Sequence, residues 1–214
     1  GAFIWQNDSL SGYNSKPAIG KDGTIYSLVG GLSAIDPDGK VKWANNIGFN
    51  QFHSELSLDN DENIYTTGKV VSKVSKDGLQ LWEFQPHTNF YTWCVVIDGY
   101  NNLYFTDYRN PDPSLPHLYS LNKDGQIRWK ITGSGGGYDC AITKDNKIIT
   151  DGDSIRMYDT SGTLLWKVSP LSDTIPYTYS ENIFLDEEDN IYYLGFFSTV
   201  GAYASSLTIS GERR

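Results

Sequence analysis

The sequence predicts an all-β fold, a five-bladed β-propeller whose blades are four-stranded antiparallel sheets. Three observations support this prediction. Short apolar segments alternate with polar residues at a period of two, which is typical of half-buried strands. Asp-Gly and Ser-Gly turns recur between these segments. The whole pattern returns at a spacing of about 40 residues, which is the length expected of a propeller blade.

In every repeat, an apolar residue of the innermost strand precedes an apolar residue of the second strand by six positions. This constant distance predicts the same short hairpin in all five repeats, at one end of the sheets. The pairs are Ile19 and Ile25, Leu58 and Ile64, Ile97 and Leu103, Ile142 and Ile148, and Leu185 and Ile191.

A third strand, a tight turn and a tryptophan strand complete four of the repeats. Glycine adopts the positive φ that tight hairpins require, so a constant spacing from glycine to tryptophan predicts one hairpin geometry. The glycine stands four residues before the tryptophan in the pairs Gly39 and Trp43, Gly78 and Trp82, Gly125 and Trp129, and Gly162 and Trp166.

The fifth repeat has a third strand and a turn at Gly211, but no tryptophan strand follows in this sequence. Residues 2–8 contain Trp5 and stand before the first inner strand. We therefore expect this N-terminal strand to complete the last blade and to close the ring, which removes its open edges. The expected single domain, 1–214, has blades at about 16–47, 55–85, 94–132, 139–169 and 182–211 plus 2–8.

The stretch "PAIGKDGTIYSLVGGLSAIDPDGKVKW", residues 17–43, resembles the PQQ-type β-propeller repeat of quinoprotein dehydrogenases, outer-membrane assembly lipoproteins and bacterial surface proteins. The resemblance extends over the whole chain and implies a bacterial propeller in which the Asp-Gly and Trp positions are structural. The enzymes and lipoproteins of that family have eight blades, whereas this sequence has strands for five. The vicinal cysteine pair of the quinone site is absent, so we expect neither PQQ nor another cofactor.

The composition narrows the classes of partner. A formal charge of −9 repels phosphate backbones and anionic membrane surfaces, which argues against nucleic acid as a ligand. No run of 18 apolar residues is present, so we expect no membrane insertion. We expect an extracellular or cell-surface protein, either a monomer or a part of a larger polypeptide. Cys94 and Cys140 lie in apolar strand patterns, which favours buried free thiols over a disulfide.

The loops at the other end of the sheets vary in length, which usually marks the binding face of a repeat fold. They are residues 83–93, 107–117, 167–181 and 195–204. Aromatic residues near these loops suit a sugar or a protein ligand, although they also suit packing between blades. The predicted contact residues are Tyr13, Phe52, His53, Tyr91, Trp93, Arg109, Tyr138, Tyr177, Tyr179, Glu181 and Phe197.

The function that we expect is a binding module without catalytic activity, for a carbohydrate or a surface ligand. A protein-interaction or sensor propeller is the first alternative. A glycoside hydrolase is the second, with Glu55, Asp139 and Glu181 as its carboxylates. We prefer to interpret these carboxylates as solvated or paired with a cation such as Lys16.

The other motifs in the sequence do not indicate a phosphate, calcium or zinc site. The stretch "GSGGGYD", 133–139, lacks the Lys-Ser/Thr ending of a phosphate loop. Residues 59–63 and 186–190 are acidic turns without the EF-hand pattern, so solvated turns are favoured over calcium sites. The three histidines, His53, His87 and His117, lack zinc-ligand spacing, and no metal site is expected.

Overall fold

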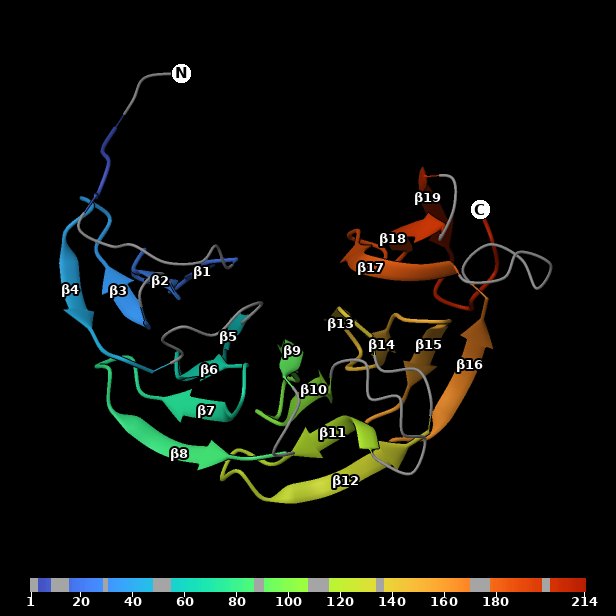
Figure 1. Cartoon of the computed structure of the whole chain (residues 1–214), viewed down its shortest axis with the longest axis horizontal. Helices are drawn as coiled ribbons and strands as arrows, with labels where there is room; N and C mark the ends of the chain where they lie inside the picture. The colour runs from blue at the N-terminus through green and yellow to red at the C-terminus, as the bar shows by residue number, and fades with distance from the viewer. Residues whose placement is uncertain are drawn as a thin grey trace. The chain divides into compact units, whose positions relative to one another are not determined.

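A computed structural model describes residues 4–8, 16–28, 31–47, 55–86, 91–107, 116–133, 137–169, 178–197 and 201–214. These residues form nineteen β-strands and no helix, as the sequence predicts. Among them there is accordingly no helix long and apolar enough to cross a membrane. The strands lie in five antiparallel sheets (Figure 1).

The first compact unit of the chain, Gly1–Val95, contains two complete sheets. Each has its strands in sequence order, so every connection is a hairpin between neighbours. The first sheet is β1 (Ala18–Ile19), β2 (Ile25–Ser27), β3 (Ser33–Ile35) and β4 (Val41–Ala44). The second is β5 (Leu56–Leu58), β6 (Ile64–Thr66), β7 (Val71–Val74) and β8 (Gln80–Phe84).

The second compact unit, Val96–Arg214, contains the other three sheets, and the unit boundary falls within β9. The third sheet is β9 (Thr92–Ile97), β10 (Leu103–Asp107), β11 (Pro116–Leu121) and β12 (Ile127–Thr132). The fourth is β13 (Cys140–Ile142), β14 (Ile148–Thr150), β15 (Ile155–Tyr158) and β16 (Leu164–Val168). The fifth is β17 (Thr178–Leu185), β18 (Ile191–Phe197) and β19 (Gly201–Leu207).

The predicted register of the inner hairpins is confirmed. Ile19 pairs with Ile25, Leu58 with Ile64, Ile142 with Ile148 and Leu185 with Ile191. Four sheets have four strands as predicted, and the fifth has three. Residues 4–8 form no strand, so closure of a five-bladed ring by the N-terminal segment stays a prediction.

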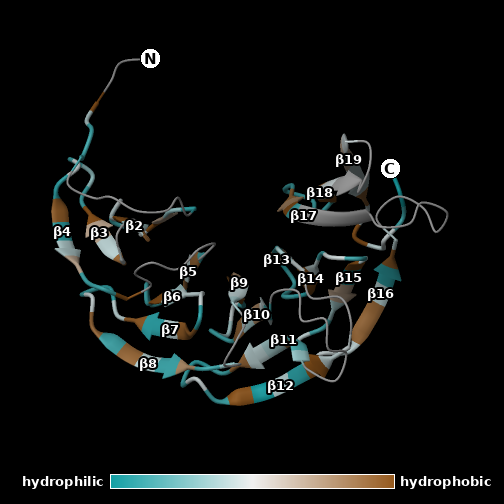
Figure 2. Ribbon diagram, viewed as in Figure 1, coloured by the Kyte–Doolittle hydropathy of each residue, from teal (hydrophilic) through white to brown (hydrophobic). Residues whose placement is uncertain are grey.

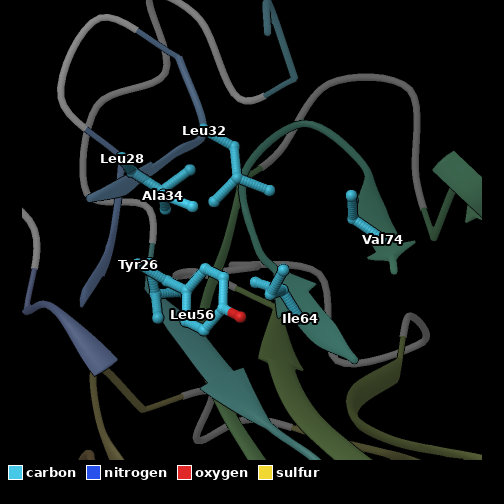
Figure 3. Packing of buried hydrophobic residues seen from close by; sticks show 7 residues of the cluster. All are labelled: Tyr26, Leu28, Leu32, Ala34, Leu56, Ile64 and Val74. Atoms are coloured by element: carbon cyan, nitrogen blue, oxygen red, sulfur yellow. The ribbon is translucent and has the colours of Figure 1, made fainter. Parts of the chain in front are cut away.

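The core lies between the faces of neighbouring sheets. In the first unit, Tyr26, Leu28 and Leu32 from the first sheet pack with Leu56 and Ile64 from the second (Figure 3). In the second unit, equivalent clusters join the third sheet to the fourth and the fourth to the fifth. The outer strands β8 and β12 alternate hydrophobic and hydrophilic residues, as half-exposed strands do (Figure 2).

Three tryptophans of the outer strands, Trp43, Trp129 and Trp166, each join their sheet to the outer turn of the next. The Trp43 ring lies against Gly78, where an added Cβ would meet ring atoms at 2.9 Å, and its Nε1 donates to the Lys76 carbonyl at 2.9 Å. Gly78 also has a φ of 86°, so the turn requires glycine twice over. Trp129 and Trp166 repeat this contact on the turns at Gly162 and Gly211.

The N-terminal segment makes the same contact. Trp5 lies against Gly39 and donates to the Pro37 carbonyl at 2.9 Å. Asn7 donates to the Gly39 carbonyl at 2.7 Å, as Asn45 does to Gly78 at 3.1 Å. Residues 4–8 therefore contact the first sheet in the way that the outer strand of a preceding sheet would.

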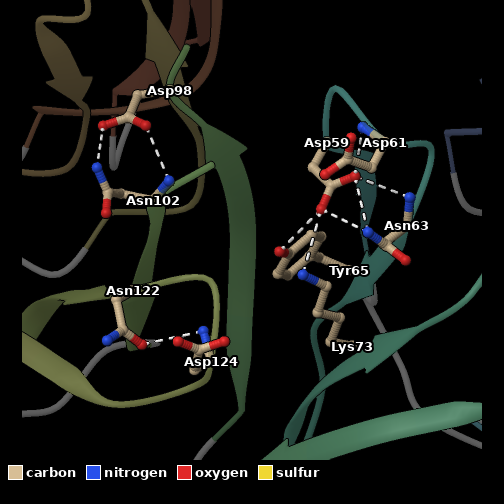
Figure 4. A network of polar contacts seen from close by, with 9 residues as sticks. All are labelled: Asp59, Asp61, Asn63, Tyr65, Lys73, Asp98, Asn102, Asn122 and Asp124. Atoms are coloured by element: carbon tan, nitrogen blue, oxygen red, sulfur yellow. Dashed lines mark hydrogen bonds and ion pairs between the residues drawn. The ribbon is translucent and has the colours of Figure 1, made fainter. Parts of the chain in front are cut away.

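Polar networks hold the inner turns of the second and third sheets (Figure 4). Asp59 accepts hydrogen bonds from the Asn63 side chain and from the Tyr65 hydroxyl, and forms an ion pair with Lys73 at 3.3 Å. Asp98 accepts in the same way from Asn102 and Tyr104. In the described residues, no group of acidic, cysteine or histidine side chains is arranged to hold a metal ion.

The expectation of free thiols was wrong. Neither Cys94 nor Cys140 is free, and both are disulfide-bonded. Both side chains are buried, as the apolar strand pattern predicts. Burial alone does not distinguish a thiol from a half-cystine, because each is a small apolar group that packs well in a core.

Candidate functional site

Several predicted contact residues cannot be placed. Tyr13, Phe52, His53, Arg109 and Tyr177 lie outside the described residues. Tyr179 and Glu181 are on β17 and Phe197 is on β18, and only their backbone belongs to the described part. Their contact with a ligand stays a prediction.

Three predicted contact residues are described. Tyr91 and Trp93 are half-buried at the start of β9. The Trp93 carbonyl accepts a hydrogen bond from the Thr67 hydroxyl at 2.8 Å, which ties this position to the second sheet. Tyr138 is buried, and its backbone N–H donates to the Asp151 carboxylate at 2.7 Å.

Two of the three carboxylates of the glycoside-hydrolase alternative have structural partners. Glu55 forms an ion pair with Lys16 at 3.2 Å, one of the two environments that we expected for these carboxylates. Asp139 accepts backbone hydrogen bonds from Cys140 at 2.8 Å and from Ile183 at 3.0 Å, which joins the fourth sheet to β17. The Glu181 side chain is outside the described part.

A different group of polar side chains gathers where the third and fourth sheets meet. The strands β10 and β11 are neighbours in one sheet, β14 and β15 in the next, and all members stand where the second strand ends or the third begins. Three of these residues interact with one another, and we call them the His117 cluster: His117, Asp153 and Arg156. Asp107 and Asp151 stand at the corresponding strand ends. All but Asp153 are buried, which is costly for charged groups and therefore uncommon without a role.

His117 is the member of the cluster whose hydrogen-bonding groups are least satisfied. It is 5% exposed, and neither ring nitrogen makes a hydrogen bond of good geometry within the described part of the chain. Burial and the positive charge of Arg156 lower the pKa of His117 to about 4, against opposing effects of the Gly133 backbone and Asp153. The imidazole is therefore neutral at physiological pH.

Arg156 carries the positive charge of the cluster. Its guanidinium forms an ion pair with Asp153, and Nη1 donates to the Ser154 carbonyl at 3.2 Å. The Arg156 side chain is 7% exposed, whereas that of Asp153 is 53% exposed. A buried cation is thus partnered by a carboxylate that stands half in solvent.

The two buried carboxylates at the neighbouring strand ends, Asp107 and Asp151, interact with residues near them. Burial and the nearby Asp107 carboxylate raise the pKa of Tyr119 to about 12, so this phenol stays protonated. The Tyr119 ring stacks on Phe105 at 4.9 Å. Asp151 accepts the backbone N–H groups of Tyr138 and Asp139. Gly137 passes so close to Asp151 that a Cβ there would lie 2.2 Å from the carboxylate oxygen.

Sequence reasoning missed this cluster. Asp107 and His117 are the two ends of the long loop 107–117, which the sequence indicated as an insertion. The spacing of the three histidines excludes a zinc motif but carries no information on other neighbours of His117. Its neighbours Asp153 and Arg156 come from the next sheet, and a contact between two sheets cannot be predicted from the spacing of residues along the chain.

The fold is that of β-propeller proteins. Virginiamycin B lyase from Staphylococcus aureus has a TM-score of 0.76 at 15% identity, over 95% of this chain and 69% of the lyase. A gluconolactonase from Xanthomonas campestris has a TM-score of 0.56 at 13% identity, over 83% of this chain and 67% of that one. BamB from Moraxella catarrhalis has a TM-score of 0.62 at 14% identity, over 92% and 62%. No family model matches the chain, and no curated protein matches its sequence.

These similarities correct the expectation that the protein has no enzymatic activity. Two of the three solved structures are named as enzymes, a lyase and a gluconolactonase. That expectation depended on the absence of catalytic motifs in the sequence. A propeller assembles its reactive groups from several blades, so the absence of a local motif does not exclude catalysis.

Proposed function

We propose that this chain is a propeller enzyme acting on a polar small molecule by proton transfer at the His117 cluster. In an elimination the proton would leave a carbon atom of the substrate, and in a hydrolysis it would leave the attacking water. Both reactions need a base that is unprotonated at working pH and held next to charged groups.

The observation that carries this proposal is the state of His117. A buried imidazole normally donates and accepts hydrogen bonds, because an unpaired polar group in the interior is costly. Here the neutral ring has no hydrogen bond of good geometry among the described residues, only a weaker interaction with the Gly133 backbone, and it stands beside a buried cation. Such a group is suited to accept a proton from a ligand.

The names of the structural neighbours support a reaction of this kind. One of them is a catalytically inactive histidine-to-alanine variant of virginiamycin B lyase with quinupristin. At 15% identity this similarity extends to the fold and not to individual residues.

We propose a carbohydrate-like, polyhydroxylated molecule as the ligand class. Sugar hydroxyls pair with carboxylate, imidazole and guanidinium groups, which are the side chains of the His117 cluster. The disulfide-bonded cysteines fit an oxidising compartment, so we also propose an extracellular or cell-surface location. We do not propose nucleic acid as a partner, because the net negative charge of the chain repels a phosphate backbone.

The alternative, a protein-interaction propeller, is favoured by one surface feature. Leu79, directly before the outer strand β8, and Leu81 on β8 are 68% and 51% exposed. Apolar residues on an outer strand suit contact with another protein. If this is the function, a Leu79→Ser, Leu81→Ser variant loses a partner that cross-linking captures, while a His117→Asn variant keeps it.

The enzyme proposal is tested with a panel of lactones, cyclic depsipeptides and oligosaccharides, with mass spectrometry as the readout. We expect turnover of at least one class, reduced about 10²- to 10⁴-fold in His117→Asn, as for loss of a general base. Tyr100→Ala is the matched control, because this exposed ring lies on an inner turn of the third sheet. Equal turnover by His117→Asn, or no turnover across the panel, contradicts the proposal.

A further inference from the structure

We propose that this chain associates head to tail with a second copy of itself, by packing the open face of its fifth sheet on the open face of the first sheet of that copy. This surface belongs to the two end sheets, so its use does not depend on the proposed function. Three junctions between neighbouring sheets show what each face of a sheet contacts.

In these three junctions, one face of a sheet packs on the sheet that follows it in the chain. Tyr26 of the first sheet packs with Leu56 and Ile64 of the second (Figure 3). Tyr104 of the third sheet packs in the same way on the fourth, and Ile149 of the fourth packs on the fifth. Tyr26, Tyr104 and Ile149 are each the second residue of the second strand, and none is more than 3% exposed.

The fifth sheet leaves this face uncovered. Tyr192 is the second residue of the second strand β18, but it is 40% exposed. Phe184 pairs with Tyr192 across the two inner strands, and Leu194 stands two residues further along β18, so the three side chains share one face. Phe184 is 50% exposed and Leu194 is 44% exposed. Adjacent exposed apolar side chains on a sheet face indicate a contact surface.

The opposite face of a sheet packs on the preceding sheet, and the first sheet leaves that face uncovered. Leu58, Ile142 and Leu185 each end the innermost strand of their sheet and belong to the junction with the preceding sheet. Ile19 ends the innermost strand of the first sheet and is 69% exposed. The chain therefore presents both halves of one type of junction, one on its first sheet and one on its fifth.

The outer strands fit the same junction. Residues 4–8 contact the outer turn of the first sheet as the outer strand of a preceding sheet would. The fifth sheet has three strands and ends at β19, where Arg213 pairs with Leu207 at one end of the edge. A strand edge accepts a further strand through its backbone groups. Residues 4–8 of one copy can therefore line up along β19 of the other.

A second copy suits these faces better than a foreign protein, because it carries the matching half of the junction. The structures of virginiamycin B lyase also support a partner from outside the chain. They extend beyond the part that this chain covers, which is 69% to 71% of their length. A fold of this type therefore has room for sheets that a single copy does not supply.

The inner turns indicate that this contact is weaker than the junctions within the chain. The Gly99 backbone N–H donates to the Asn146 side chain on the next turn at 2.9 Å. The Lys144 N–H donates in the same way to Asp189 at 3.1 Å. The first sheet has Gly23 at the position of these acceptors, and glycine has no side chain to accept the bond. Asparagine fits there, since Asn146 has a φ of 64° and Gly23 one of 82°.

The test is sedimentation equilibrium of the whole chain over a series of protein concentrations. We expect reversible association that continues beyond a dimer, because a head-to-tail contact leaves one open face on each end. Ile19→Asp and Leu194→Asp should each weaken association about tenfold or more, since each places a carboxylate in the contact. Both side chains are exposed, so both variants should keep the Tm of the wild type. An equal mixture of the two variants should form a 1:1 dimer, because one intact contact remains.

Two matched pairs sharpen the test. Gly23→Asn should strengthen association about fivefold, the effect of one added hydrogen bond. Gly23→Ala adds the same Cβ beside Pro37 without an amide and should not strengthen it. Ile127→Asp is the control for the aspartate variants, because Ile127 is 50% exposed on the outer strand β12 and not on an end face. This control should associate like the wild type.

A wild type that stays monomeric at every concentration overturns the proposal, as it would if the two faces closed on each other within one chain. The proposal is also overturned if the wild type associates and both end-face variants associate equally well. Loss of association in Ile127→Asp, or a mixture of Ile19→Asp and Leu194→Asp that forms no dimer, contradicts the head-to-tail contact in the same way.

Discussion

The lowered pKa of His117 predicts that the folded protein loses a defined amount of stability in mild acid. Its pKa is lowered from 6.5 to about 4 in the folded protein by burial and by Arg156. Between these two values the unfolded chain binds a proton that the folded chain does not bind, so the free energy of unfolding falls as the pH falls. Above pH 6.5 the contribution is complete, and below pH 4 no more is lost. At 1.36 kcal/mol per pKa unit, the loss is about 3 kcal/mol.

The assay is urea unfolding at a series of pH values for the wild type and His117→Asn. Asparagine does not titrate in this range, so the difference between the two proteins isolates the histidine. Hydrogen bonds from Thr24 lower the pKa of Asp22 to about 2, and the Asn190 side chain is the main cause that lowers that of Asp186 to about 2. Both carboxylates titrate in either protein and cancel in the difference.

The expected result is a difference that changes by about 3 kcal/mol between pH 7 and pH 4. The wild type loses this free energy of unfolding, and the variant does not. Parallel curves for the two proteins would refute the reasoning, because they would mean that His117 titrates normally in the folded state.

Three further predictions concern the fold. Trp43→Ala removes a ring packed on Gly78 and the hydrogen bond to Lys76, and should cost about 3 kcal/mol in chemical unfolding. A cost near zero would show that this contact is incidental. Lys73→Ala leaves the buried Asp59 carboxylate without its cation and should cost about 3 to 5 kcal/mol, whereas Lys42→Ala, in an exposed pair, should cost less than about 1 kcal/mol. Denatured, unreduced protein should show no titratable thiol, and reduction should lower Tm, by an amount corresponding to about 2 to 4 kcal/mol; two titratable thiols would contradict this.

Much of the fold could be predicted because its repeat is local. The six-residue spacing from Leu58 to Ile64 sets a hairpin whose register the structure confirms. The positive φ of Gly78 follows from a turn that only glycine adopts without strain. Each of these features depends on neighbours within a few residues, so one sequence contains the whole signal.

The candidate site could not be predicted in the same way. His117 and Arg156 approach each other from two sheets, and the chain between them contains residues 133–139 and three whole strands, β12, β13 and β14. The interpretation of the acidic residues as solvated or paired with a cation fits Glu55, which pairs with Lys16, but not Asp139, which is buried and accepts backbone hydrogen bonds. The state of the cysteines failed because burial is common to thiols and disulfides.

The central claim is that His117 acts as a base on a bound substrate. Its most direct test is the ratio of kcat/KM between the wild type and His117→Asn on the best substrate of the panel, measured at pH 7 where both are folded. We expect the kcat/KM of the wild type to exceed that of His117→Asn by a factor of about 10² or more. The control Tyr100→Ala is expected to keep the melting profile of the wild type. A ratio near one, with both proteins folded, would contradict the claim and move the reactive group elsewhere in the chain.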